Sequence, residues 1–179
     1  MKIVREITLL ACGEYAKSKE WKRIRKSLHK AICGVDWPRG SGAFTIYPEL
    51  GKGRRQGNGV KPIKLGLLEE LERQGWKREQ PLDIAILKRP GKLDAVLYTQ
   101  FGPVALEWET GNISSSHRAL NKMALGLLKG VLACGILVVP SRKLYKYLTD
   151  RVGTWRNWSR TSISGARSPV SKVFCKLLW

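Results

Sequence analysis

Three carboxylates stand close together in the segment from Leu93 to Lys122, and their spacing suits hydrolytic chemistry. Glu107 and Glu109 are two residues apart in a stretch of alternating character, so an extended strand would place both on one face. If Leu93–Tyr98 and Pro103–Glu109 form a hairpin that pairs residue 98 with residue 103, Asp94 lies opposite Glu107. The spacing therefore predicts a carboxylate cluster on neighbouring strands.

Such a cluster needs a positive partner. Side chains directly opposed on antiparallel strands have Cβ atoms roughly 4.5–5.5 Å apart, and two carboxylates that close repel each other unless a cation or a raised pKa relieves the repulsion. A hard divalent ion with oxygen ligands, Mg²⁺ in a cell, meets this need. The alternative is a pair of solvated acids on an exposed face, which is the commoner origin of an isolated Glu-x-Glu pair.

Composition points to a polyanionic partner. The 179 residues include 33 Lys and Arg against 14 Asp and Glu, which gives a net charge of +19 and is typical of proteins that neutralise phosphates. No apolar run approaches the ~18 residues of a membrane span, and the N-terminal segment does not fit a signal peptide. We expect a cytoplasmic protein without membrane contact. A non-catalytic basic DNA-binding protein would explain the same charge.

Cysteine and histidine offer little to a catalytic site. The four cysteines are widely separated and form no Cys-x-x-Cys pair, and only two histidines are present. Neither a zinc cluster nor a serine-histidine-aspartate triad is indicated. Any hydrolysis must therefore depend on carboxylates.

The periodicity predicts a mixed α/β (α+β) fold, in which helices flank a central mixed β-sheet. A basic amphipathic helix is indicated by Trp21, Ile24, Leu28, Ala31 and Ile32 at helical spacing, although such a charge run is more often a solvated face than a DNA contact. The other expected elements are a short strand at 44–46, a helix at 64–74, strands at 82–87, 93–98 and 103–109, a helix at 112–131 and a buried strand at 135–139.

The string ETGNISSSHRALNK at 109–122, followed by YLTDRV at 147–152, resembles the BamHI family of type II restriction endonucleases. The segments WPRGSGAFTI at 37–46, GNGVKPIK at 57–64 and REQPLDI at 78–84 extend the similarity over residues 30–152. The resemblance implies a restriction-endonuclease core and a homodimer that cuts duplex DNA at GGATCC with Mg²⁺. It also implies a cognate DNA methyltransferase in the same restriction-modification system.

The resemblance also assigns roles to individual residues. Asp94 and Glu107 are expected to hold the metal, Glu79 to assist it, and Glu109 to act as a candidate general base at a position where the wider nuclease superfamily carries lysine. The implied DNA-binding residues are Lys64, Asn112, Ser114, Arg118, Asp150 and Arg151. Arginine can bond to guanine and aspartate can accept from cytosine in the major groove. Without the resemblance, Asn112 and Ser114 are helix N-cap candidates, Asp150 and Arg151 a surface ion pair, and Lys64 a solvated side chain.

The chain departs from the family pattern after residue 152. No Asp or Glu follows Asp150, whereas the family continues with an acidic helix. We therefore divide the chain into a catalytic and DNA-recognition domain, 1–152, and an atypical basic tail, 153–179. Codons chosen for Gly153–Gly165 encode NLAELEPYFYLW in a shifted phase, which is similar to the missing family segment, so an out-of-frame tail is our hypothesis.

Loss of that helix predicts a weakened dimer and an exposed sheet edge at the 135–139 strand. A catalytically inactive truncated homologue is accordingly the second alternative.

Overall fold

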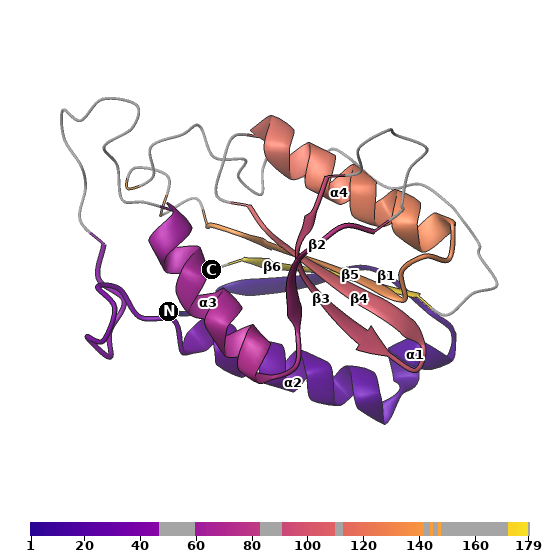
Figure 1. Ribbon diagram of the computed structural model, residues 1–179, viewed down its shortest axis with the longest axis horizontal. Helices are drawn as coiled ribbons and strands as arrows, with labels where there is room; N and C mark the ends of the chain where they lie inside the picture. Colours follow the sequence, from indigo (N-terminus) through magenta and orange to yellow (C-terminus); the bar gives the residue numbers. More distant parts are fainter. Residues whose placement is uncertain are drawn as a thin grey trace.

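The computed structural model describes residues 1–46, 60–82, 91–109, 113–141, 144, 147 and 172–178. Six strands form one mixed sheet in the order β1-β6-β5-β4-β3-β2. They are β1 (Arg5–Cys12), β2 (Lys77–Gln80), β3 (Leu93–Thr99), β4 (Gly102–Trp108), β5 (Cys134–Val139) and β6 (Lys172–Leu178). The helices are α1 (Gly13–Lys17), α2 (Lys19–Cys33), α3 (Val60–Arg73) and α4 (Ile113–Leu128). The predicted class, a mixed sheet flanked by helices, is confirmed (Figure 1).

Strand directions divide the sheet into a parallel centre and antiparallel edges. β5 pairs in parallel with both β4 and β6, whereas β1–β6, β2–β3 and β3–β4 are antiparallel pairs. The crossover between β4 and β5 is α4, as a parallel connection requires. The predicted exposed edge at β5 is wrong, because β6 pairs along its free side.

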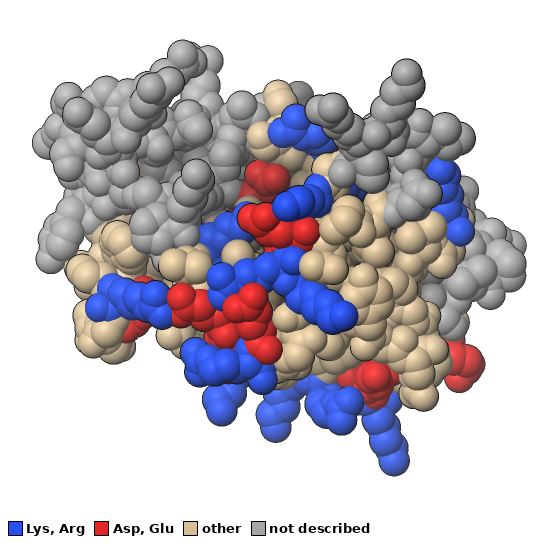
Figure 2. Space-filling model, viewed as in Figure 1, with Lys and Arg blue, Asp and Glu red and all other residues tan. Residues whose placement is uncertain are grey.

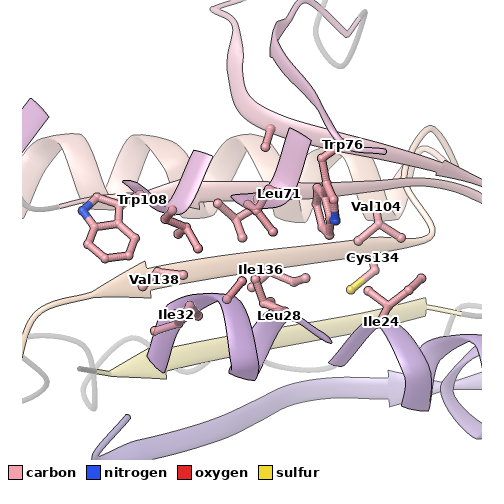
Figure 3. Packing of buried hydrophobic residues seen from close by; sticks show 14 of the residues in the cluster. Ile24, Leu28, Ile32, Leu71, Trp76, Val104, Trp108, Cys134, Ile136 and Val138 are labelled. Atoms are coloured by element: carbon pink, nitrogen blue, oxygen red, sulfur yellow. The ribbon is translucent and has the colours of Figure 1, made fainter. Parts of the chain in front are cut away.

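Helix α2 covers one face of the sheet with the apolar stripe that the sequence predicted. Trp21, Ile24, Leu28, Ala31 and Ile32 are all buried. The outer side of this helix is basic, and Figure 2 shows Lys and Arg side chains gathered along the lower edge of the view, where α2 lies in Figure 1. In Figure 3, Ile24, Leu28 and Ile32 lie against Cys134, Ile136 and Val138 of β5. Helix α3 adds Ile63, Leu67 and Leu71 to the same core.

Helix α4 covers the opposite face of the sheet and completes the layered arrangement (Figure 1). Its buried residues Ala119, Leu120, Met123 and Leu127 join a second cluster with strand residues that include Ala105 and Leu137. Strand β5 is buried on both faces, as expected for a central strand between two helical layers. Within the described ranges, no helix has the length and apolar composition needed to cross a membrane.

The β3–β4 hairpin has the predicted register. Tyr98 pairs with Pro103 and Ala95 with Leu106. The turn is tighter than expected, because Thr99 already pairs with Gly102 and only Gln100 and Phe101 form the loop. Gly102 has a φ of 112°, which a residue with a Cβ rarely adopts. The turn therefore fixes which side chains of the two strands face each other.

Two of the predicted strands, at 44–46 and 82–87, are not found as predicted in the described residues. At 44–46 the structure has an isolated bridge between Trp37 and Phe44 in place of a strand. Most of the strand predicted at 82–87 lies outside the described residues, and the strand paired with β3 in the described part is β2, at 77–80. The strand β1 was not predicted at all.

Candidate active site at the β3–β4 hairpin

Asp94 and Glu107 lie opposite each other on β3 and β4. The register that pairs Ala95 with Leu106 places them at the next step of the ladder. Glu107 is only 5% exposed and Asp94 is half-buried. The structure thus brings together the first two residues of the predicted carboxylate cluster.

Both oxygens of Asp94 are engaged. Oδ2 accepts a hydrogen bond of 2.8 Å from the backbone N–H of Trp108. Oδ1 forms an ion pair with Lys64, which reaches it from α3. A backbone donor and a side-chain cation together hold this carboxylate in one orientation. Lys64, expected only to lie near DNA, therefore belongs to the carboxylate site.

Glu107 is paired with Lys122 of α4, a residue that was not predicted for the site. The Lys122 ammonium also donates to the carbonyl oxygens of Lys92, at 3.0 Å, and Gly91, at 3.4 Å. Three acceptors match the three N–H donors of an ammonium. Lys122 thus ties helix α4 to β4 and to the segment just before β3.

The signal for Lys122 was present in the sequence. Ser114, Arg118 and Lys122 follow one another at intervals of four residues in α4, which places them on one helix face. Ser114 and Arg118 were predicted to bind DNA, so the same face could have been extended to Lys122. The spacing alone does not show that this face of α4 packs beside Glu107, because that depends on where the helix lies on the sheet.

The surroundings of Glu107 disfavour the ionised form of its carboxyl group. Burial first, and then the neighbouring Asp94 carboxylate, raise the pKa of Glu107 to about 7, although the ion pair and hydrogen bond with Lys122 oppose this shift. A buried carboxyl beside a second carboxylate resists ionisation for these two reasons. Near neutral pH the carboxyl group of Glu107 is therefore partly protonated and partly ionised.

Glu109 extends the site by one strand step. It follows the end of β4, and its backbone N–H donates to the carbonyl oxygen of Val138 at 2.9 Å. Burial raises the pKa of Glu109, Asp94 raises it further, and Lys64, Arg118 and Lys122 oppose these effects. The predicted trio of carboxylates is accordingly coupled through space, with basic side chains from α3 and α4 around it.

The remaining predicted residues are exposed or lie outside the described residues. Ser114 and Arg118 are exposed on α4, where Arg118 donates to the hydroxyl of Ser115 at 3.3 Å. Glu79 has a φ of 46° on β2, and its exposed carboxylate pairs with Lys92 at 3.2 Å. Three predicted DNA-binding residues lie outside the described residues: Asn112, Asp150 and Arg151.

The donor set fits a hard cation only in part. Within the part of the chain that the structure describes, no three His, Cys, Asp or Glu side chains are grouped so that they could hold a metal ion. Two facing carboxylates are nevertheless the kind of partial set to which Mg²⁺ binds, because this ion keeps several waters and takes further oxygens from substrate phosphates. The mutual repulsion of Asp94 and Glu107 is a second feature that a divalent cation would relieve.

Comparisons with known proteins agree on one family. The family model described as restriction endonuclease BamHI matches residues 1–167. The type II restriction enzyme OkrAI of Oceanobacter kriegii is 50% identical over 133 residues, which is 74% of this chain and 66% of that protein. The type II restriction enzyme BamHI of Bacillus amyloliquefaciens is 38% identical over 146 residues, or 76% of this chain and 66% of that protein. The chain thus matches about two thirds of the length of each relative.

The fold has a solved counterpart. The restriction endonuclease BglII, crystallised with a DNA 16-mer, superimposes with a TM-score of 0.54 at 10% sequence identity, over 88% of this chain and 70% of that one. At so low an identity the likeness shows the fold alone. It supports the restriction-endonuclease-like core that the sequence predicted.

Proposed function

Because the chain belongs to the BamHI family of restriction endonucleases, we propose that it hydrolyses duplex DNA at a specific sequence with the help of Mg²⁺. The observation that carries this proposal is the facing pair of carboxylates, Asp94 and Glu107, each held by a lysine from a different helix. A protein that only bound DNA would gain nothing from buried acids that repel phosphate. Their position at a basic surface suits phosphodiester cleavage.

Asp94 and Glu107 would hold the metal ion through their carboxylate oxygens. When bound, the ion would lower the pKa of a water molecule and offset the charge that develops on the attacked phosphate. Lys64 and Lys122 supply positive charge at these oxygens. We propose that both lysines would also bind phosphate oxygens of the substrate.

Glu109 would accept the proton of the attacking water. A general base works best when its pKa lies near the working pH, and burial shifts the pKa of Glu109 upward in that direction. Lys64, Arg118 and Lys122 limit the shift, so the carboxylate remains available as a base. Glu79 would assist at the metal, which requires its carboxylate to leave Lys92.

The target we propose is GGATCC, read by side chains at the start of α4 and by a later segment. Arg118 and Arg151 would bond to guanine, Asp150 would accept from cytosine, and Asn112 and Ser114 would complete the contacts. A palindrome of this kind matches two-fold symmetry, so the active form would be a homodimer. A cognate methyltransferase would protect the same sequence in the host.

The test is a cleavage assay with matched plasmids. One plasmid carries a single GGATCC and the other carries the same site with its central bases exchanged. The purified chain with Mg²⁺ should linearise only the first, and EDTA should stop the reaction. Equal cutting of both plasmids would refute sequence specificity, and tight binding without any cutting would favour a non-catalytic DNA-binding protein.

A further inference from the structure

Helix α2 carries a continuous basic stripe on its outer side. Its members are exposed and fall at intervals of one, three or four residues: Lys19, Lys22, Arg23, Lys26 and Lys30. At ~100° per residue they occupy one arc of the helix, opposite the buried arc centred on Leu28. The stripe runs for about 16 Å along the helix axis at ~1.5 Å per residue.

These cations have no acidic partners in the described part of the chain. The acids of α3 are occupied by arginines outside the stripe, in the pairs Arg39–Glu69, Arg73–Glu70 and Arg78–Glu72. The one arginine of α2 that forms an ion pair, Arg25 with Glu6, lies off the stripe. The stripe therefore presents uncompensated positive charge to the solvent.

The stripe is separate from the carboxylate site. Helix α2 covers one face of the sheet and α4, which carries Arg118 and Lys122, covers the other (Figure 1). In Figure 2 the cations of α2 project from the lower edge, away from the side on which α4 lies in Figure 1. A straight duplex seated at Asp94 and Glu107 would not lie along this stripe.

We propose that the outer face of α2 binds the phosphates of a second stretch of duplex DNA without regard to its sequence. Duplex DNA carries one negative charge per ~1.7 Å of its axis, so a 16 Å stripe faces several phosphates at once. A membrane surface fits less well. An amphipathic helix binds lipid through a free apolar face, and the apolar face of α2 is buried in the core, with Leu28 2% and Ile32 0% exposed.

The consequence is a second contact with DNA, separate from the one at the carboxylate site. Contacts to phosphate alone are sequence-independent and allow a protein to slide and hop along DNA. The α2 stripe would keep the chain on non-target DNA while the carboxylate face samples sites. This role does not depend on cleavage, and it would persist in a catalytically inactive chain.

The test compares two double variants that remove the same charge. Lys22→Gln with Lys26→Gln neutralises the centre of the stripe, and Lys77→Gln with Lys129→Gln neutralises two exposed lysines outside α2. Binding to a duplex without GGATCC is measured in EDTA across a salt series. Since each phosphate contact contributes about 0.9 to the slope of log K against log salt, the stripe variant should lower that slope by about 2, and the control variant should leave it near the wild-type value.

Three results would overturn the proposal. The slope could be unchanged in the stripe variant, it could fall equally in both variants, or wild-type binding could favour single-stranded RNA or anionic vesicles over duplex DNA. Thermal unfolding of both variants checks that they are folded. Wild-type failure to cut a GGATCC plasmid would refute the proposed function and leave the slope comparison valid.

Discussion

The backbone N–H of Trp108 on β4 donates a 2.8 Å hydrogen bond to the carboxylate of Asp94 on β3. Trp108 is buried beneath the sheet on the α2 side, so its amide cannot move without disturbing the core. The orientation of Asp94 is therefore set by the packing of the hairpin. A substitution at Asp94 can therefore remove the charge of this side chain and leave its position unchanged.

Asp94→Asn should abolish cleavage and preserve the fold. The amide oxygen can still accept from Trp108, but the charge that pairs with Lys64 and would bind metal is lost. Metal-ion stabilisation of several kcal/mol corresponds to a rate loss of about a hundredfold or more. Single-turnover cleavage with saturating Mg²⁺ measures it. Asp36→Asn is the matched control, because Asp36 accepts from the N–H of Gly42 away from the hairpin. A rate for Asp94→Asn equal to that of the control would contradict the assignment.

Lys122→Met should destabilise the metal-free protein. It removes the partner of the buried Glu107 carboxylate, and a buried acceptor left without a partner costs about 1–3 kcal/mol. The free energy of unfolding in urea at about pH 8 provides the measurement. Lys129→Met, at an exposed position just after α4, serves as the control. Adding Glu107→Gln to Lys122→Met should restore part of the loss, and a double variant less stable than the single one would argue against the pairing.

Stability should fall as the pH rises from about 5 to about 8. The folded-state pKa of Glu107 is raised to about 7 from an ordinary value of 4.5, so between these values the folded chain holds a proton that the unfolded chain has released. This contribution to stability is complete at a pH below the ordinary pKa of 4.5, and it is lost as the pH rises through the folded-state pKa of about 7. At ~1.4 kcal/mol per pKa unit the loss is of the order of 3 kcal/mol.

The contribution of Glu107 is isolated by comparing variants across this pH range. Glu107→Gln should flatten the decline, whereas Glu14→Gln, at an exposed position, should not. Parallel curves for wild type and Glu107→Gln would show that another group titrates. Mg²⁺ should reduce the decline in the wild type, since a bound cation favours the ionised carboxylate.

Two glycine substitutions should have opposite signs. Gly102→Ala forces a residue with a Cβ to adopt a φ of 112°, and such strain costs about 1–3 kcal/mol. Gly66→Ala lies within α3, where the new Cβ would meet only Val35 at 3.9 Å, and replacing a helical glycine gains about 0.5–1 kcal/mol. Thermal unfolding of both variants checks the prediction. Stabilisation by Gly102→Ala would mean that the tight hairpin turn is not retained.

The parts of the site that lie close in sequence could be predicted from it. The hairpin register followed from matching the ends of two adjacent strands around a short loop, and the pairing of residues 98 and 103 confirms it. The basic helix followed from its apolar spacing. Both patterns are local, so the chain itself limits the possible arrangements.

Contacts between distant segments could not be predicted. The pairing of Lys64 with Asp94 joins α3 to β3, and the pairing of Lys122 with Glu107 joins α4 to β4. Neither follows from a period of two or 3.6 residues, because each depends on how a helix docks on the sheet. Strand β1 was missed for a related reason. Its partly exposed residues do not alternate regularly, and its partner is β6, more than 150 residues away in the chain.

The place of β1 in the sheet has a consequence for the order of folding. Of the six described strands, β1 comes first in the sequence, and its single neighbour in the sheet, β6, comes last. Pairing at such separation is slow, because a long loop must close before any contact forms. Strands β2 to β5 can assemble on the ribosome with α4, whereas β1 must wait until β6 has docked on β5. During translation, β1 is thus the strand of this sheet that waits longest for its partner.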